Sequence, residues 1–105
     1  MEKPNLSYIE SMSGGDKAFK QKLIDIIKTE FPQEKVIYFK NIKANNYKEA
    51  AENVHKLKHK ISILGLIKSY DLAVEFEHNL IDGNSNSKKD FEFILQNITN
   101  FLEIL

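Results

Sequence analysis

A histidine and a lysine one helical turn apart are the residues of this chain whose types and spacing could do chemistry. One face of a predicted helix carries His55, Lys58, His59 and Ser62, which are spaced i, i+3, i+4 and i+7. This face is rotated away from the apolar stripe of the same helix, so we expect His55 to be partly exposed. An exposed imidazole is largely neutral at cellular pH and can attack a phosphoryl group. Lys58 is placed to neutralise the phosphoryl oxygens, and phosphoryl transfer depends mainly on such positioning and charge stabilisation.

The distribution of charge is more informative than its total. The 105 residues include 15 basic and 15 acidic side chains, and this balance argues against non-specific nucleic-acid binding. From His55 to Lys68, however, there are four lysines and no carboxylate. One basic patch on a neutral protein predicts one acidic partner.

The two histidines of this helix, His55 and His59, are also spaced like a pair of metal ligands. The zinc motif with this spacing carries glutamate directly after the first histidine, where this chain has Lys56. The flanking lysines repel a cation and no third ligand is suggested, so we predict no metal site. His78 is expected to be a surface residue.

Composition gives an expectation for the compartment. The chain has no cysteine, no apolar run near the roughly 18 residues of a membrane span, and no signal-peptide pattern in its opening residues. We therefore expect a soluble, cytoplasmic protein with no membrane partner. We see no Gly-rich phosphate loop and no ATP-binding domain, so an autonomous enzyme is not predicted.

The spacing of apolar residues predicts helices throughout, because they recur every three or four positions and no segment alternates with period two. We expect helices over residues 6–12, 16–43, 47–64, 67–81 and 88–105, with a polar loop at 82–87 and Asn46 or Asn45 as the N-cap of the third. Pro32 is expected to kink the second helix, with a break into two as the alternative. The buried face of that helix is predicted to carry Phe19, Leu23, Ile26, Ile27, Phe31, Val36, Phe39 and Ile42. This pattern favours a single all-α domain over residues 1–105, an antiparallel four-helix bundle with a short additional N-terminal helix.

The chain resembles the histidine-containing phosphotransfer (HPt) domains of phosphorelays over nearly its whole length. The signature of that family is His-x-hydrophobic-Lys-Gly on a helix, with a second glycine ten residues after the histidine. This chain has His55-Lys56-Leu57-Lys58-His59, followed by Gly65 at the tenth position. Residues 6–16 are similar to the family's first helix and its Gly-Asp boundary, Phe31-Pro32 to the proline of its second helix, and residues 50–55 and 72–77 to its alanine-rich and Leu-Glu stretches.

The resemblance implies that His55 takes a phosphoryl group from an aspartyl phosphate of a receiver domain and passes it to the aspartate of another receiver. Lys58 would stabilise the phosphoryl group, and the receiver would supply Mg²⁺, so the chain needs no cofactor of its own. The family also implies a monomer that docks through the histidine face and the short first helix. The side chains expected to flank the site or to dock are Lys56, His59, Ser62, Ile9 and Met12.

One departure from the family pattern leaves two alternative functions open. His59 stands where the family has glycine after its lysine, and its side chain would project toward an incoming partner. The first alternative is therefore a non-catalytic module of the same fold that binds receivers or histidine kinases without phosphotransfer. The second is a small helical adaptor unrelated to signalling, in which His55 has no role in partner binding.

Overall fold

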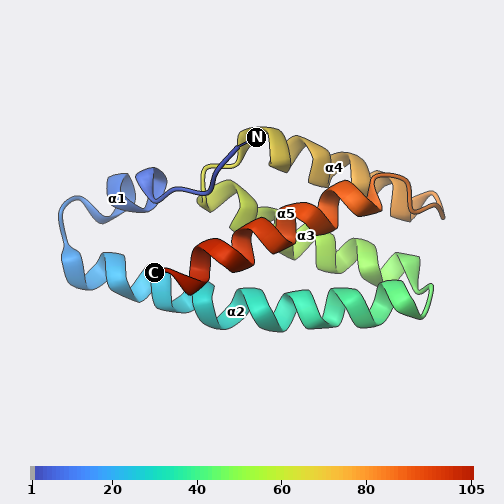
Figure 1. Ribbon diagram of the computed structural model, residues 1–105, viewed down its shortest axis with the longest axis horizontal. Helices are drawn as coiled ribbons and strands as arrows, with labels where there is room; N and C mark the ends of the chain where they lie inside the picture. Colours follow the sequence, from blue (N-terminus) through green and yellow to red (C-terminus); the bar gives the residue numbers. More distant parts are fainter. Residues whose placement is uncertain (1) are drawn as a thin grey trace.

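The computed structural model describes residues 2–105 and is all-helical (Figure 1). Its helices are α1 (Ser7–Ser13), α2 (Lys17–Lys43), α3 (Tyr47–Ile63), α4 (Ile67–Ile81) and α5 (Lys88–Glu103), and no strand occurs within residues 2–105. Each helix begins and ends within two residues of its predicted bounds, so the all-α prediction is confirmed. α3 packs against both α2 and α4, while α5 contacts α4 and α2, and α1 packs on α2.

The ends of α2 show how local sequence sets the elements. Gly14 ends α1 in the left-handed conformation, with φ 58°, and the Asp16 side chain accepts a hydrogen bond from the Phe19 amide at 3.0 Å to begin α2. α2 then continues unbroken past Pro32, so the alternative of two helices is wrong. A proline removes one backbone hydrogen bond, but the buried Phe31 and Tyr38 hold the helix to the core on both sides. Asn46 precedes α3 as expected, although its side chain makes no capping hydrogen bond.

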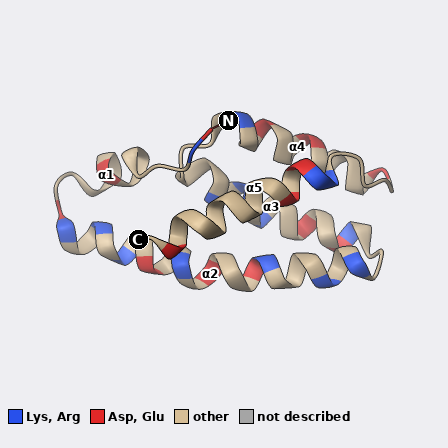
Figure 2. Ribbon diagram, in the orientation of Figure 1, with Lys and Arg blue, Asp and Glu red and all other residues tan. Residues whose placement is uncertain are grey.

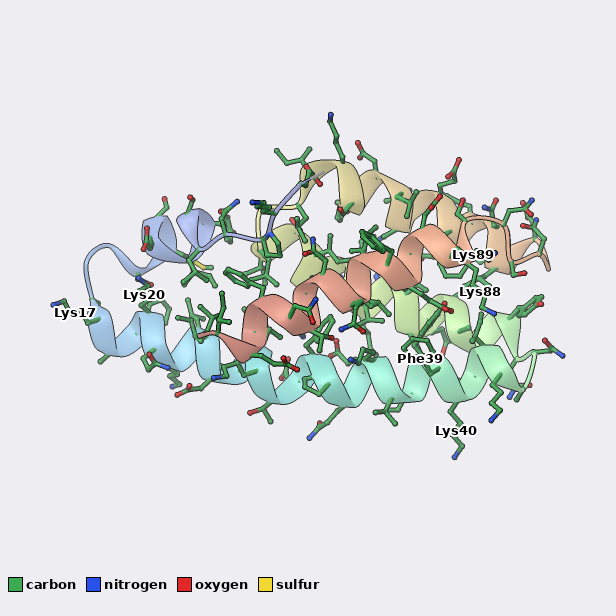
Figure 3. All side chains as sticks on the ribbon, in the orientation of Figure 1. Lys17, Lys20, Phe39, Lys40, Lys88 and Lys89 are labelled. Atoms are coloured by element: carbon green, nitrogen blue, oxygen red, sulfur yellow. The ribbon has the colours of Figure 1, made fainter. Side chains whose placement is uncertain are left out.

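The buried face of α2 differs from the predicted one. Phe19, Ile26, Val36 and Phe39 are exposed, and the buried side chains are Ile24, Ile27, Phe31, Tyr38 and Ile42. These five follow one continuous stripe of the helix, whereas the exposed four lie on other sides of it. Figure 3 shows Lys40, on the solvent side of the same helix, pointing away from the other helices.

Tyr38 was not among the residues predicted to be buried, and its polar hydroxyl has a partner. It donates to Glu92 Oε2 at 3.0 Å, which satisfies the group inside the protein. Burial raises the pKa of Tyr38, and the neighbouring Glu92 carboxylate raises it further. The Tyr38 ring also packs against Phe91 and Phe76, at 5.3 and 6.2 Å between centroids, and so ties α2 to α5 and α4.

Residues 2–5 form hydrogen bonds to the turn between α3 and α4 and to the start of α4. The Asn5 amide donates to Leu64 O at 2.9 Å, and the two oxygens of Glu2 accept hydrogen bonds from the Lys68 and Ser69 amides, each at 2.8 Å. Gly65 has φ +79°, and a Cβ built there would lie 2.5 Å from Nδ2 of the Asn5 side chain. Glycine is therefore required at the turn, both for its backbone conformation and for the close approach of the N-terminal segment.

We predict that Glu2→Ala lowers the free energy of unfolding by about 1 kcal/mol at neutral pH, because Glu2 caps the start of α4. Burial alone would raise the pKa of Glu2, but the hydrogen bonds from Lys68 and Ser69 outweigh it and hold the pKa below the ordinary value of a glutamate. The ionised carboxylate therefore stabilises the fold above its unfolded-state pKa, and this contribution is lost as the pH falls through the lower folded-state value. Urea unfolding at several pH values should show wild type and variant converging in acid, whereas Glu103→Ala, at the exposed end of α5, should match wild type throughout.

Charged residues of both signs are interspersed along the helices and do not gather on one of them (Figure 2). Among residues 2–105, no helix combines the length and apolar character needed to cross a membrane. Lys20, labelled in Figure 3, pairs with Glu10 at 2.8 Å and links α1 to α2.

Candidate functional site

His55 lies on the flank of α3, beside a fully buried stripe. Val54, Leu57 and Ile61 of this helix have no exposed surface, whereas the His55 side chain is 53% exposed. The predicted rotation of His55 away from the core is therefore confirmed. The exposed half of its ring can be reached by a partner without unfolding any element.

Glu77 of α4 connects His55 to Lys58. His55 Nδ1 lies 3.2 Å from Glu77 Oε2, and Lys58 Nζ donates to Glu77 Oε1 at 3.0 Å. The side chains of Lys58 and Glu77 are only 12% and 18% exposed, so most of this ion pair is shielded from water. The close packing of α3 on α4 brings the three groups together although Glu77 is 22 residues from His55.

This contact fixes which nitrogen of His55 is free. A carboxylate paired with an ammonium group accepts hydrogen bonds and donates none, so the His55 nitrogen that faces it must carry the proton. In the neutral ring the proton is then on Nδ1 and the lone pair is on Nε2. The geometry leaves Nε2 as the nucleophilic atom.

Lys58 does not face the open side of the histidine ring. Its ammonium group is held by Glu77 and lies 5.8 Å from the centre of the Tyr70 ring. In this arrangement Lys58 orients the Glu77 carboxylate. The predicted contact between Lys58 and a phosphoryl group stays a prediction, and it would require this ion pair to open.

The remaining residues predicted to surround His55 are exposed. The His59 ring stands nearly perpendicular to the His55 ring, with 5.1 Å between centroids and an interplanar angle of 89°. Lys56 and Ser62 are also exposed, and no hydrogen bond joins Ser62 to His55 among the residues that the structure describes. His59 therefore lines one side of the His55 ring, as its place in the sequence suggested.

The two residues of α1 predicted to dock a partner differ in their surroundings. Ile9 has no exposed surface and belongs to the core, so its predicted docking role is wrong. Met12 is 45% exposed, but it lies on α1, which packs on α2. The spacing of apolar residues on so short a helix did not distinguish the buried side from the free one.

The basic run from His55 to Lys68 is partly neutralised by other helices. Besides the pair between Lys58 and Glu77, Lys60 Nζ lies 2.7 Å from Glu30 and 3.2 Å from Glu34, both on α2. Burial would lower the pKa of Lys60, but the hydrogen bond with Glu30 and the attraction of Glu34 outweigh it and raise the pKa. The sequence could not show these pairs, because the partners lie far from the run along the chain.

A shallow hollow of about 600 Å³ opens beside His55 between α3 and α4. We call it the α3–α4 hollow, and its lining residues are Lys48, Ala51, Glu52, His55, Lys56, Glu77 and Ile81. The residues that the structure describes hold no group of three or more potential metal ligands, here or elsewhere.

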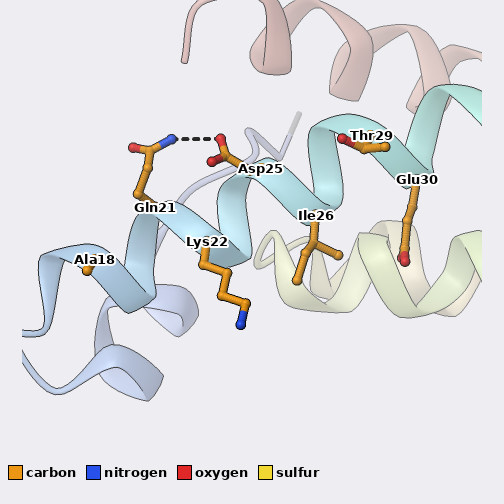
Figure 4. Close-up of a pocket in the computed structure, with 7 residues that line it drawn as sticks. All are labelled: Ala18, Gln21, Lys22, Asp25, Ile26, Thr29 and Glu30. Carbon is orange, nitrogen blue, oxygen red and sulfur yellow. Dashed lines mark hydrogen bonds between the residues drawn. The ribbon is translucent and has the colours of Figure 1, made fainter.

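A second hollow, of about 580 Å³, lies along α2 (Figure 4). All seven of its lining residues belong to α2 itself, and the one hydrogen bond among those drawn joins Gln21 to Asp25 at 2.9 Å. It has no wall from another helix and contains no histidine. The α3–α4 hollow, which has two walls and is lined by His55, is therefore the stronger candidate site.

No protein-family model, curated protein or solved structure matches this chain. The function must therefore be argued from the geometry around His55.

Proposed function

We propose that this chain is an HPt-like phosphocarrier that moves a phosphoryl group between the aspartates of receiver domains through His55. The observation that carries the proposal is the half-exposed His55 ring, with Nδ1 held by the Glu77 carboxylate and Nε2 left free. The resemblance of residues 55–65 to the phosphotransfer signature adds to it. On this proposal, helices α2 to α5 are an antiparallel four-helix bundle to which α1 is added, and the protein works in the cytoplasm as a monomer.

The transfer step balances with the groups present. The Nε2 lone pair of His55 attacks phosphorus, and the bond between phosphorus and the aspartate oxygen breaks. The aspartate leaves as a carboxylate, and the proton of His55 stays on Nδ1. The phosphorylated ring carries a positive charge that the adjacent Glu77 carboxylate compensates, and the next receiver reverses the step. The receiver brings the Mg²⁺ that neutralises the phosphoryl oxygens.

A non-catalytic module of the same fold is the second candidate, and one observation favours it. The His59 ring packs edge-on against the His55 ring, at the position where the phosphotransfer signature has glycine. A bulky side chain there narrows the approach of a receiver to His55. Under this alternative the chain binds receivers or histidine kinases, and no phosphohistidine forms.

The test is phosphoryl transfer from radiolabelled receiver domains, with Mg²⁺, to wild type and to three matched variants, His55→Gln, His59→Gln and His78→Gln. We expect acid-labile, base-stable label on wild type, His59→Gln and His78→Gln, and complete loss of label in His55→Gln. If His55→Gln keeps the label, the acceptor is another histidine. If a broad panel of receivers leaves wild type unlabelled but binds it, the non-catalytic module is correct.

A further inference from the structure

His55 lines a hollow whose walls come from two helices. Among the residues lining the α3–α4 hollow, His55 and Ala51 come from α3 and Glu77 and Ile81 from α4, with none from α1 or α2. On the other side along α3, the perpendicular ring of His59 stands one turn away. A partner that reaches His55 through this hollow avoids His59, whereas one that approaches along the C-terminal half of α3 meets it.

Exposed apolar side chains lie along the edge of α4 that borders this hollow. Ile81 is 62% exposed and lines the hollow, and Ile67 is 74% exposed at the other end of α4. Val74 lies midway between them, so residues 67, 74 and 81 are spaced by two helical turns along one edge. Ile67 also lines a smaller hollow of about 180 Å³ with Ser62 and Tyr70, again between α3 and α4. An apolar edge therefore runs the length of α4 beside the histidine helix.

The charges of the hollow favour an acidic partner. Lys48 and Lys56 are exposed at its rim, and neither has an ion-pair partner among residues 2–105. Of the two carboxylates, Glu77 is already paired with Lys58, and Glu52 alone offsets the two lysines. The His55 side chain, the exposed Ile81 and the surplus of positive charge therefore line one hollow.

We propose that the receiver domain docks on the α3–α4 hollow, with an apolar side chain against the exposed Ile81 and its acidic active-site rim against Lys48 and Lys56. This inference rests on the proposed function, because it takes an acidic, phosphoaspartate-bearing protein as the partner. It replaces α1, which the resemblance combined with the histidine face, by the edge between α3 and α4. It also assigns to Lys56, which lines the hollow with His55, the position nearest the incoming phosphoryl group, since Lys58 is held by Glu77.

The test compares two phosphodonors, phosphoramidate and phosphorylated receiver domains. In Ile81→Asp and Lys48→Glu, the ratio of the rate with the receiver to the rate with phosphoramidate should fall by about ten-fold, because each change places a charge that repels the acidic partner within the proposed interface. Lys48→Glu keeps the test decisive if Ile81→Asp does not fold, since glutamate is favourable in the first turn of a helix. The matched control is Val36→Asp, at a 64% exposed valine of α2, which should leave both rates unchanged.

The docking inference is overturned if both variants keep the wild-type ratio, or if Met12→Asp alone lowers it. A second experiment separates failure of the docking surface from failure of the proposed function. Chemical shifts of His55→Gln are mapped with beryllofluoride-activated receivers and Mg²⁺, and phosphorylation is measured on wild type. Shifts confined to residues 48–56 and 77–81, together with a wild-type protein that takes no phosphoryl group from any receiver, would support the docking surface and refute the carrier. Labelled His55 with shifts centred on α1 would refute the docking surface alone, and no binding by any receiver would refute both.

Discussion

Glu77→Ala is expected to slow phosphorylation of His55 by about ten-fold, the lower end of what loss of a histidine's orienting carboxylate costs in metal sites. The carboxylate holds Nδ1 of His55 at 3.2 Å and is itself held by Lys58 at 3.0 Å. Without it the ring can carry its proton on Nε2, which removes the nucleophilic lone pair, and the charge of the phosphorylated ring loses its compensation. The rate with phosphoramidate measures this effect without any contribution from docking.

The ¹⁵N shifts of the His55 ring report the same change independently of the reaction. We expect the Nδ1-protonated tautomer in wild type and a mixture of tautomers in Glu77→Ala. Lys58→Met should change the tautomer less, because it removes only the lysine that holds the Glu77 carboxylate in place. The matched control is Glu75→Ala on the same helix, whose carboxylate bonds Ser87 and not His55. An unchanged tautomer and rate in Glu77→Ala would show that this carboxylate does not orient His55.

Phe76→Ala is expected to lower the free energy of unfolding by about 4 kcal/mol, as for other large-to-small substitutions in a close-packed core. Phe76 has no exposed surface and packs between two other buried rings, 5.0 Å from Phe91 and 6.2 Å from Tyr38. These three rings join α2, α4 and α5, so a cavity here loosens the packing of three helices. The stability of a small domain is only about 5–15 kcal/mol, and the change should remove a large share of it.

Urea unfolding followed by circular dichroism measures this loss. The matched control is Phe93→Ala on α5, where the ring is 56% exposed and the cost should stay within about 0.5 kcal/mol. Equal effects of the two substitutions would mean that the core is not centred on the cluster of Tyr38, Phe76 and Phe91.

The helices of this chain could be predicted from its sequence because their signals are local. Gly14 and Gly65 end helices, Asp16 caps one, and the apolar spacing continues through Pro32. The buried face of α2 was predicted less well. That helix carries apolar residues on several stripes, and the packing of α1, α3 and α5 against it decides which stripe is buried. Tyr38 was missed because its partner, Glu92, is 54 residues away.

Part of the candidate site could likewise be predicted from the sequence, and part could not. The exposure of His55 follows from its place beside Val54 on α3, and the sequence predicted it. The role of Glu77 depends on how α4 packs against α3, which no local pattern encodes, and the only signal was its place in the stretch that resembles the phosphotransfer family. The positive charge of the run from His55 to Lys68 was overestimated for the same reason. Lys58 and Lys60 are paired with carboxylates of other helices.

The central claim is that Nε2 of His55 carries the phosphoryl group. The most direct measurement is a long-range ¹H–¹⁵N spectrum of the histidine side chains, recorded with a ³¹P spectrum, after incubation with a phosphorylated receiver and Mg²⁺. We predict one phosphoramidate resonance, coupled to Nε2 of His55, while His59 and His78 stay unmodified. A phosphoryl group on Nδ1 or on another histidine, or its absence from all three, would contradict the account.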